Sequence, residues 1–323
     1  MKGRRPGFWS GQDWSGYLFI LPTLVVFLIF VVFPVLFTLY VSFHDWPLLA
    51  GLGEKREFVG LENYREVIGD EQFRKSFWNT VYYVAVSVPV GLIISLGFAV
   101  LLNTGLRGIT WYRTAFFTPV VTAGVAVGLL WRWVFNTDYG LLNYALSAGA
   151  DGLNVVLGAI GGILHAGVPL VEFTNIPWLD SPQLAMPSVI IASIWKSVGW
   201  GMVIFLAGLQ GIPQHLYEAA TLDGASSWRQ FRHVTLPLLF PAIFFVLVMS
   251  VIGSFQVFDL IYVMTGGGPL HATDVVIFYL YQFAFQRFQL GYAAAVSYIL
   301  FAVIFVLTMA QLRIFGRRVQ YET

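Results

Sequence analysis

YLFILPTLVVFLIFVVFPVLFTLYVSF, residues 17–43 of the chain, contains no charged side chain. A helix that crosses the hydrocarbon core of a bilayer needs about 20 mostly apolar residues, and this run is long enough. The run is also continuous, whereas a strand of a lumen-lined membrane barrel alternates apolar and polar residues. The stretch therefore predicts a transmembrane helix and indicates an all-α membrane protein.

The composition of the whole chain supports a membrane protein. The 323 residues are 58% hydrophobic, 17% aromatic and only 11% charged, with a mean hydropathy of +0.74. A soluble domain carries about 25% charged residues. Prolines occur inside the apolar runs, and neighbouring helices can satisfy the backbone groups that they free. We predict six transmembrane helices, at 17–43, 78–102, 112–135, 187–209, 236–262 and 292–315.

The distribution of lysine and arginine predicts the orientation, because these residues favour the cytoplasmic ends of spans. None occurs between Arg132 and Lys196, which suits an external segment at 136–186. The side of the membrane on which the loop at 44–77 lies is less clear. It mixes basic and acidic residues, and it is long enough for the preference of lysine and arginine for the cytoplasmic side to lose force. We predict that both termini lie inside. The inner ends then hold Lys2, Arg4, Arg5, Arg107, Arg113, Arg229, Arg232, Arg313, Arg317 and Arg318.

The spans divide the chain into segments. The apolar run that follows the basic N-terminus is too long for a signal peptide and lacks a small-residue cleavage site, so we expect a retained anchor. The expected segments are a cytoplasmic tail at 1–16, the first span at 17–43, an external loop at 44–77, a core of five helices at 78–315 and a cytoplasmic tail at 316–323. The core would include the external insertion at 136–186 and a polar loop at about 210–236.

Residues 153–171, LNVVLGAIGGILHAGVPLV, are nearly long enough to be a seventh span. A seventh span would move everything after it to the other side of the membrane. The run contains Asn154, His165, several glycines and Pro169, and it has no basic flanks. An external helix on the membrane or against the protein is the better interpretation, and the sequence leaves the choice open.

Several classes of chemistry lack support in the sequence. Without cysteine there is no thiol catalysis, disulfide or cysteine metal site. No G-x-x-x-x-G-K-[ST] phosphate loop occurs, and the glycine-rich TGGGPL at 265–270 has no lysine and suits a sharp external turn. The five histidines have no metal-ligand spacing, and a net charge of +1 gives no support for nucleic-acid binding. We expect no catalytic residue, no metal and no cofactor bound by this chain.

Residues 216–239, LYEAATLDGASSWRQFRHVTLPLL, form a polar module between two apolar runs. Its pattern suits a short helix after Pro213, a break at Asp223-Gly224, and a second helix capped by Ser226 or Ser227. An ordinary polar loop with one helical turn fits the periodicity as well. The spans contain almost no ionisable residues of the kind that relay protons, so we expect the driving energy to enter elsewhere, through a cytoplasmic contact at this module.

The spacing of this module resembles the EAA loop of ABC importer permeases. Glu218-Ala219-Ala220, three residues, Gly224, nine residues and Val234-Thr235-Leu236-Pro237 match the pattern, with Val234 in place of isoleucine. Other stretches resemble the carbohydrate-uptake branch, in particular its larger, maltose-type permease subunit, and the resemblance covers almost the whole chain. These stretches are residues 17–46, FVGLENYREV (58–67), residues 79–103, YVMTGGGP (262–269) and GYAAAVSYIL (291–300).

The resemblance implies a permease that pairs with a second, homologous permease, two copies of a cytoplasmic ATPase and an external sugar-binding protein. ATP and Mg would be used by the ATPase, not by this chain. The module would be a coupling helix in a groove of the ATPase, with Glu218 as an ion-pairing residue and Ala219 and Ala220 as close-contact positions. Asp223 and Gly224 would make the bend, and Leu236-Pro237 would start the next span.

Candidate substrate residues come from the spans and from the resemblance. Ser250, Ser254 and Val257 fall on one helical face at i, i+4 and i+7. In the resemblance these positions contact sugar, but Val257 cannot form a hydrogen bond, which argues against identity with a maltose carrier. The complete candidate set is Trp195, Trp200, Ser250, Ser254, Gln256, Asp259 and Tyr298.

These observations lead to one expected function and two alternatives. We expect a non-enzymatic, multi-pass permease subunit of a carbohydrate importer in a prokaryotic cytoplasmic (inner) membrane. One alternative is a permease for glycerol 3-phosphate or another polar solute, for which Lys196 is the basic residue nearest the candidate site. The other is a stand-alone carrier or a membrane-embedded enzyme. The sequence does not identify the sugar, because specificity would be shared with the partner permease and the binding protein.

Overall fold

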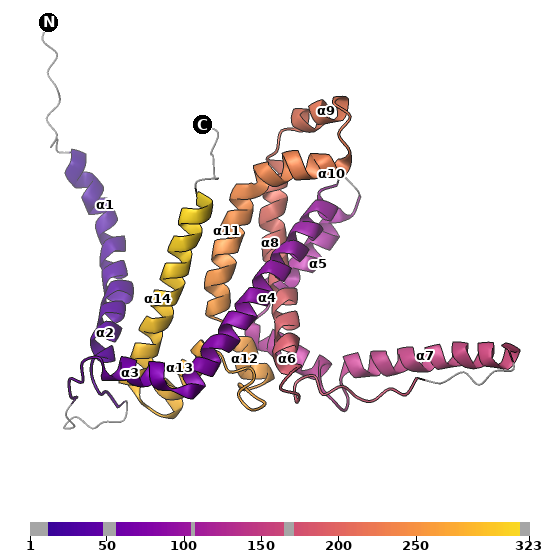
Figure 1. The fold of residues 1–323 in the computed structure, drawn as a ribbon. Coiled ribbons are helices and arrows are strands. Elements are labelled where there is room, and N and C mark those ends of the chain that lie inside the picture. Colours follow the sequence, from indigo (N-terminus) through magenta and orange to yellow (C-terminus); the bar gives the residue numbers. More distant parts are fainter. Residues whose placement is uncertain (1–11, 48–55, 105–106, 165–170, 317–323) are drawn as a thin grey trace, which may run out of the picture. The chain divides into compact units, whose positions relative to one another are not determined.

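The computed structural model describes residues 12–47, 56–104, 107–164 and 171–316. In these residues the chain is helical and contains only isolated bridges in place of a sheet (Figure 1). The chain divides into two compact units, one of residues 1–69 and 281–299 and one of residues 70–280 and 300–323. The all-α expectation is confirmed for the described residues.

The first unit contains the N-terminal apolar helix. α1 (Gln12–Phe27), the π-helical segment η1 (Leu28–Val32) and α2 (Phe33–Ser42) follow one another without a break. Residues 16–42 of this run are long and apolar enough to cross a membrane, as the sequence predicted. Most of its large side chains are exposed within this chain, so lipid or another subunit must cover them. α3 (Glu62–Gly69), η3 (Gln282–Gln286) and the start of α14 (Leu290–Phe315) complete the unit.

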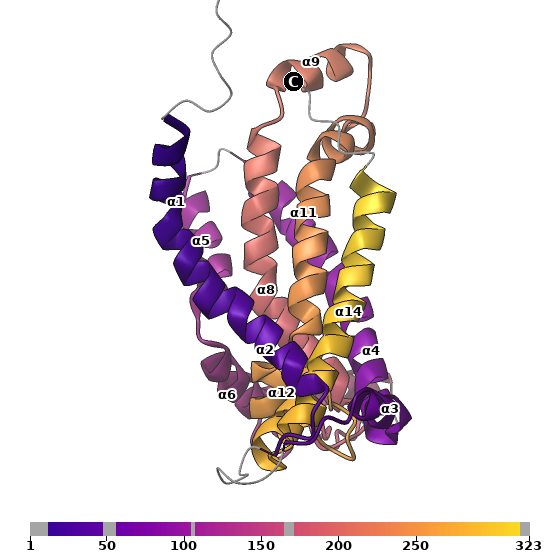
Figure 2. The ribbon, with the colours of Figure 1, turned by 90° about the vertical axis from the view of Figure 1, so that its left-hand side faces the viewer.

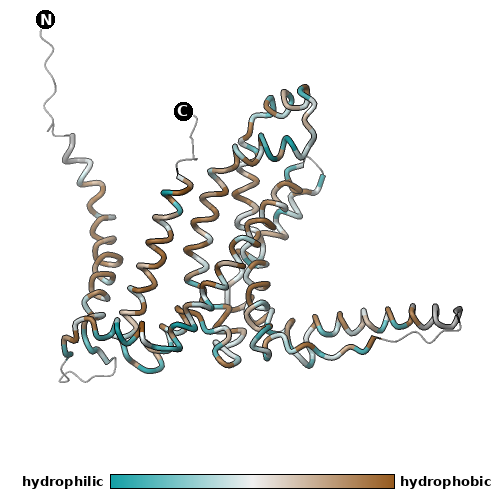
Figure 3. Tube along the Cα trace, viewed as in Figure 1, coloured by the Kyte–Doolittle hydropathy of each residue, from teal (hydrophilic) through white to brown (hydrophobic). Residues whose placement is uncertain are grey.

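The second unit is built on three long helices, α4 (Glu71–Leu102), α8 (Ala185–Gln210) and α11 (Leu236–Phe255). α8 and α11 run side by side in both ribbon views (Figures 1 and 2). Buried residues of all three, including Ala99, Met202 and Leu239, form one apolar cluster. The helices are apolar along most of their lengths, while the segment at α9 and α10 is hydrophilic (Figure 3). This contrast places the polar module at one end of the apolar bundle.

The remaining helices of this unit are shorter or lie beside the bundle. They are α5 (Ile109–Val121), α6 (Gly124–Val134), α7 (Leu141–Leu164), α9 (Gln214–Leu222), α10 (Ser227–Gln230), η2 (Phe231–Thr235), α12 (Asp259–Met264) and α13 (Val276–Tyr281).

The structure corrects the expected span at 112–135, which is not one continuous helix. α5 and α6 are separate helices that meet at an angle of 101°. Thr122 and Ala123 between them have extended backbone angles. α6 packs on α12 through its glycines, because a Cβ at Gly128 would come within 2.9 Å of Val263. Five helices of the described residues are therefore long and apolar enough to span, or six if the bent pair is one span.

The expected span at 236–262 also differs. A helical run begins at Ser227, continues through η2 and ends at Phe255. The chain then leaves the helix at Gln256, and α12 begins at Asp259. α4 starts earlier than residue 78, because the Asp70 side chain caps it by accepting a hydrogen bond from the Phe73 N–H at 2.9 Å. Capping favours a polar first turn that a hydropathy pattern does not detect.

α7 includes the ambiguous apolar segment up to residue 164, while residues 165–170, and with them His165, lie outside the described part of the chain. Figure 1 shows α7 running crosswise to α8 in the same unit. A helix is therefore present over much of 153–171, and its external location stays a prediction.

Gly199 allows α5 and α8 to pack closely. A Cβ at this position would overlap the backbone carbonyl of Phe116. We expect Gly199→Val to lower stability by about 3 kcal/mol or more, because a backbone atom cannot move aside as a flexible side chain can. The melting temperature of the detergent-solubilised protein would measure this loss. Gly97→Val on α4 is the matched control, since no atom lies within 4 Å of a Cβ there. Equal melting temperatures for the two variants would contradict this account of the packing.

Candidate functional site

A cavity of about 560 Å³ lies inside the second unit, between α4, α8 and α11. α12 and the residues between α11 and α12 close one side of it. Its wall combines apolar groups with seven hydroxyl-bearing side chains. The hydroxyl-bearing lining residues are Tyr83, Ser87, Ser95, Ser193, Ser197, Ser250 and Ser254.

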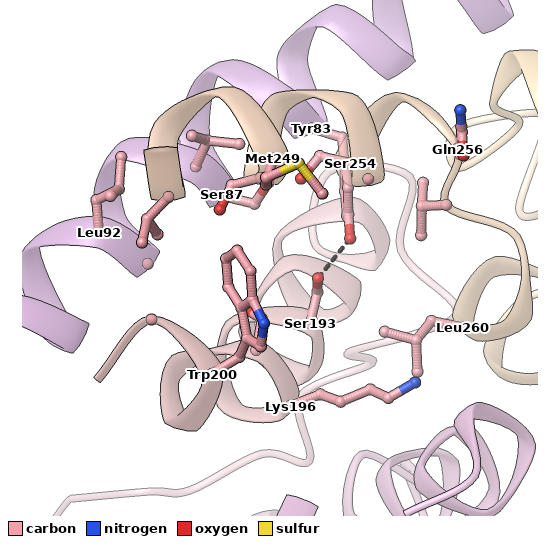
Figure 4. A pocket seen from close by; sticks show the side chains of 18 of the residues that line it. Tyr83, Ser87, Leu92, Ser193, Lys196, Trp200, Met249, Ser254, Gln256 and Leu260 are labelled. Atoms are coloured by element: carbon pink, nitrogen blue, oxygen red, sulfur yellow. Dashed lines mark hydrogen bonds between the residues drawn. The ribbon is translucent and has the colours of Figure 1, made fainter. Parts of the chain in front are cut away.

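The serines recur at whole-turn spacing along the long helices, so those of one helix lie on the same face. Ser87 and Ser95 lie two turns apart on α4, and Ser193 and Ser197 lie one turn apart on α8. The Tyr83 hydroxyl is hydrogen-bonded to the Ser193 hydroxyl across the cavity wall (Figure 4). The Ser87 hydroxyl is buried and has no hydrogen-bond partner among the described residues. A buried polar atom without a partner is costly, so a bound polar molecule or water near Ser87 would be favourable.

Trp200 provides an aromatic wall. Figure 4 shows its indole reaching from α8 toward Ser87 and Met249 on the opposite side of the cavity. The ring also packs against Phe245, with centroids 6.2 Å apart. A flat ring beside hydroxyl groups suits a molecule that has both C–H faces and hydroxyls, since the ring offers an apolar surface and the serines can donate or accept hydrogen bonds.

Two charged side chains line the cavity. Lys196 from α8 is half-buried, and Asp259 is exposed at the start of α12. Asp259 lies against Gly124, because a Cβ at that glycine would overlap the carboxylate. In the described residues no ion pair joins Lys196 to Asp259, so both charges are available to a ligand. No group of three or more metal-ligating side chains occurs in the described part of the chain.

The structure brings together five of the predicted substrate residues, namely Trp200, Ser250, Ser254, Gln256 and Asp259. Val257 also lines the cavity, although the helix has already ended before it. Whether these residues contact substrate stays a prediction.

Two predicted residues lie elsewhere. Trp195 is about 140° around α8 from Trp200, and its ring packs edge-on against Trp131. Tyr298 belongs to the other compact unit, where its hydroxyl donates a hydrogen bond to the Val35 carbonyl. The sequence reasoning missed Tyr83, Ser87, Ser193 and Ser197. Serines at helical spacing inside otherwise apolar spans were the signal that could have found them.

The polar module has a well-defined helix end. α9 ends at Leu222, as Asp223-Gly224 predicted. The Ala225 N–H donates to the Ala220 carbonyl at 2.9 Å, the Gly224 N–H donates to the Thr221 carbonyl at 3.0 Å, and Gly224 has φ +74. This is a Schellman motif, which favours glycine at the left-handed position. The fixed sequence spacing between Ala220 and Gly224 therefore follows from the geometry of a helix terminus.

The module is connected to the base of α11. The Tyr217 hydroxyl on α9 lies 2.9 Å from the hydroxyl of the buried Thr235, where η2 meets α11. Ser226 precedes α10, but contrary to prediction its side chain makes no capping hydrogen bond. The second helix of the module continues directly into α11, which carries Ser250 and Ser254.

The outer surface of the module is unusually apolar for a polar segment. Leu222 is 90% exposed and Trp228 is 66% exposed. Glu218 and Ala219 are also exposed, while Ala220 is half-buried. These exposed apolar groups are therefore available for contact with another surface.

These features define a class of protein, namely a helical membrane protein with a polar cavity between its spans and a helical surface at one end of the bundle. Residues 67–321 match the model of the family described as "Binding-protein-dependent transport system inner membrane component". The chain belongs to this family.

Relatives match the chain over nearly their whole lengths. The sn-glycerol-3-phosphate transport system permease protein UgpA of Yersinia pestis is 34% identical over 323 residues, all of both chains. The trehalose/maltose transport system permease protein MalF of Thermococcus litoralis is 34% identical over 300 residues, 93% of this chain and 92% of the relative. A chain of a bacterial alginate ABC transporter, crystallised with an alginate pentasaccharide-bound periplasmic protein, matches with TM-score 0.76 at 22% identity over 97% of both chains. This last match shows the fold.

Proposed function

We propose that the chain is a permease subunit of an ATP-driven importer and that the cavity between α4, α8 and α11 binds its substrate, a sugar or oligosaccharide. The observation that carries the proposal is the cavity itself, a hydroxyl-lined and aromatic-walled space that opens between three long apolar helices. A pocket that combines apolar walls with several convergent polar groups is the usual form of a small-molecule site. Family membership and the names of two relatives support transport of a polar solute.

A sugar that enters the cavity loses hydrogen bonds to water. Its hydroxyl groups would form hydrogen bonds to Ser250, Ser254 and Gln256 instead, and its C–H face would stack on Trp200. The unpaired hydroxyl of Ser87 would gain a partner in the same complex. This division of roles explains why the cavity carries both polar and aromatic groups.

The polar module would be the coupling segment. α9 would sit in a groove of a cytoplasmic ATPase, with Glu218 forming an ion pair and Ala219 and Ala220 allowing close approach. The Tyr217–Thr235 hydrogen bond would carry movement of α9 to the base of α11. ATP binding and hydrolysis then need only change the contact free energy of this surface between two states in order to change the exposure of the cavity.

The remaining partners follow from this role. The chain would pair with a second, homologous permease and two ATPase copies in a prokaryotic cytoplasmic (inner) membrane, with both of its termini inside. An external binding protein would deliver the sugar. ATP and Mg would bind to the ATPase, and this chain would bind no cofactor.

Reconstitution in proteoliposomes tests the proposal. The chain would be purified with its co-expressed partners, and uptake would be measured with ATP, the binding protein or the ATPase omitted in turn. We expect uptake of the sugar carried by the binding protein, and loss of uptake on each omission. Uptake by the purified single chain without nucleotide would contradict the proposal and favour a stand-alone carrier.

Lys196 supports a second candidate, an anionic solute such as a phosphate ester. It is the one cation among the described residues that line the cavity. If the solute were an anion, Lys196→Met would reduce its uptake about 10- to 100-fold, because a hydrogen bond to a charged group contributes about 1.5–3 kcal/mol. For a neutral sugar we expect a smaller change, about two- to tenfold, because the solute has no charge to pair with the ammonium and an ordinary hydrogen bond contributes about 0.5–1.5 kcal/mol.

The measurement for Lys196 is uptake of radiolabelled glycerol 3-phosphate and of a sugar panel by the same proteoliposomes. Lys196→Arg keeps the charge and serves as the control. Glycerol 3-phosphate uptake that is unchanged in Lys196→Met would remove the anion candidate.

A further inference from the structure

The loop between α12 and α13 places two consecutive non-glycine residues in left-handed backbone. Leu270 has φ +49 and His271 has φ +58. This conformation is unfavourable for a residue with a Cβ, and it is especially rare for a large side chain such as leucine. Such strain persists only where the surroundings determine it, and it is concentrated at functional positions.

Side chains from the start of α4 hold this loop in place. The Lys75 ammonium donates to the Leu270 carbonyl at 2.7 Å. The Asn79 amide donates to the carbonyls of His271 at 3.0 Å and Asp274 at 2.9 Å. Each strained residue thus has its own carbonyl fixed by a side chain of α4.

The loop is also rigid within itself. The Thr273 hydroxyl donates to the Gly268 carbonyl at 2.7 Å. The Asp274 carboxylate is fully buried, accepts a hydrogen bond from the Gln72 amide at 2.9 Å and lies 3.1 Å from the His271 ring. Burial raises the pKa of Asp274, although these partners oppose the rise. The Asp274 carboxylate is buried although the turn that it holds is exposed. This arrangement indicates that the shape of the turn is important.

These hydrogen bonds fix the loop in a conformation that leaves the side chain of Leu270 78% exposed. The neighbouring surface of α4 begins with Asp70-Glu71-Gln72 and continues with the exposed Arg74 and Lys75. Such a charged surface is not stable in hydrocarbon, and the exposed Trp78 one turn later is typical of the headgroup level. Leu270 is therefore an exposed apolar group beside a charged surface that faces water.

We infer that Leu270 is a rigid apolar anchor for the external solute-binding protein. The inference rests on the proposed function, which puts this end of the bundle outside. A soluble partner with an apolar pocket and a rim of mixed charge fits, because Leu270 would fill the pocket while the acidic and basic residues at the start of α4 meet the rim. Rigid presentation reduces the entropy lost on docking, which explains why the strained geometry is retained.

Lipid and the second permease suit the surface less well. Lipid tails would require the charged first turns of α4 to leave water. A permanent subunit contact would be broadly apolar, whereas here the exposed leucine lies beside the charged first turns of α4. A partner that binds and leaves in each cycle needs such a small anchor.

The test replaces Leu270 with asparagine, which accepts left-handed backbone and is polar. In proteoliposomes of the complete transporter, we measure ATP hydrolysis as a function of binding-protein concentration. Leu270→Asn should raise the half-saturating concentration about tenfold or more, leave the saturating rate within about twofold, and leave the melting temperature equal or higher. Leu270→Met keeps the apolar anchor and should saturate like the wild-type transporter.

The outcomes distinguish this inference from the proposed function. An unchanged half-saturating concentration in Leu270→Asn, with normal wild-type stimulation, overturns the anchor and leaves the importer intact. A lower saturating rate or melting temperature without a change in half-saturation would assign Leu270 to subunit packing or lipid and also overturns it. A wild-type transporter that the binding protein does not stimulate would instead contradict the proposed function.

Discussion

Glu218→Arg is expected to reduce ATP-driven uptake at least about 100-fold while the chain still inserts in the membrane. Glu218 is exposed on α9 and forms no ion pair within the described residues, so the change should disturb the chain itself little. In the proposed complex it would place two like charges in an interface, which costs several kcal/mol. Each 1.4 kcal/mol corresponds to a factor of ten in binding. Either the ATPase fails to assemble, or its hydrolysis continues without transport.

Co-purification of the ATPase and the ratio of uptake to ATP hydrolysis separate these two results. Glu172→Arg is a matched control, because it is the same charge reversal at an exposed glutamate outside the module. We expect the control to behave as the unmodified protein. Normal ATP-driven uptake by Glu218→Arg would rule out the coupling role of α9.

Trp200→Ala is expected to have the second largest effect, a fall of at least tenfold in solute transported per ATP hydrolysed. The substitution removes the aromatic wall of the cavity, and loss of a central tryptophan from a binding site costs about 2 kcal/mol or more. The coupling segment is unchanged, so hydrolysis stimulated by the binding protein should persist. Uptake and hydrolysis measured in the same proteoliposomes would show the difference.

Trp195→Ala provides the matched comparison on the same helix. Trp195 is 42% exposed and packs against Trp131, outside the cavity. Its loss should change transport per ATP by less than about threefold. If the two tryptophan variants lost transport equally, the cavity would not be the substrate site, and a general effect on α8 would explain both.

The structure bears out the sequence reasoning where a local pattern is sufficient. The apolar runs at 17–43, 187–209 and 292–315 coincide with helices to within a few residues, because a run of apolar residues in lipid must form its hydrogen bonds internally. The end of α9 at Asp223-Gly224 was also predictable, because left-handed backbone favours glycine at that point.

The sequence reasoning failed where the outcome depends on contacts between distant segments. Pro119 and Gly124 in 112–135 allow a helix break, but they do not specify a bend of 101°, which accompanies the packing of α6 on α12. Helical periodicity placed Ser250, Ser254 and Val257 on one face, yet the helix ends at Phe255. Helical periodicity separates Trp195 from Trp200 by about 140°, but only the packing of α8 against α4 and α11 decides which of them faces the cavity.

The sequence by itself determined that the chain is a helical membrane protein with a polar module near residue 218, because hydropathy and glycine geometry act over a few residues. The tertiary structure alone decided which polar groups share a cavity and which strained loop α4 supports. Tyr83 and Ser193 are 110 positions apart, as Lys75 and Leu270 are 195 apart, and they meet only when their helices pack. Packing is a property of complementary surfaces, and no local pattern encodes it.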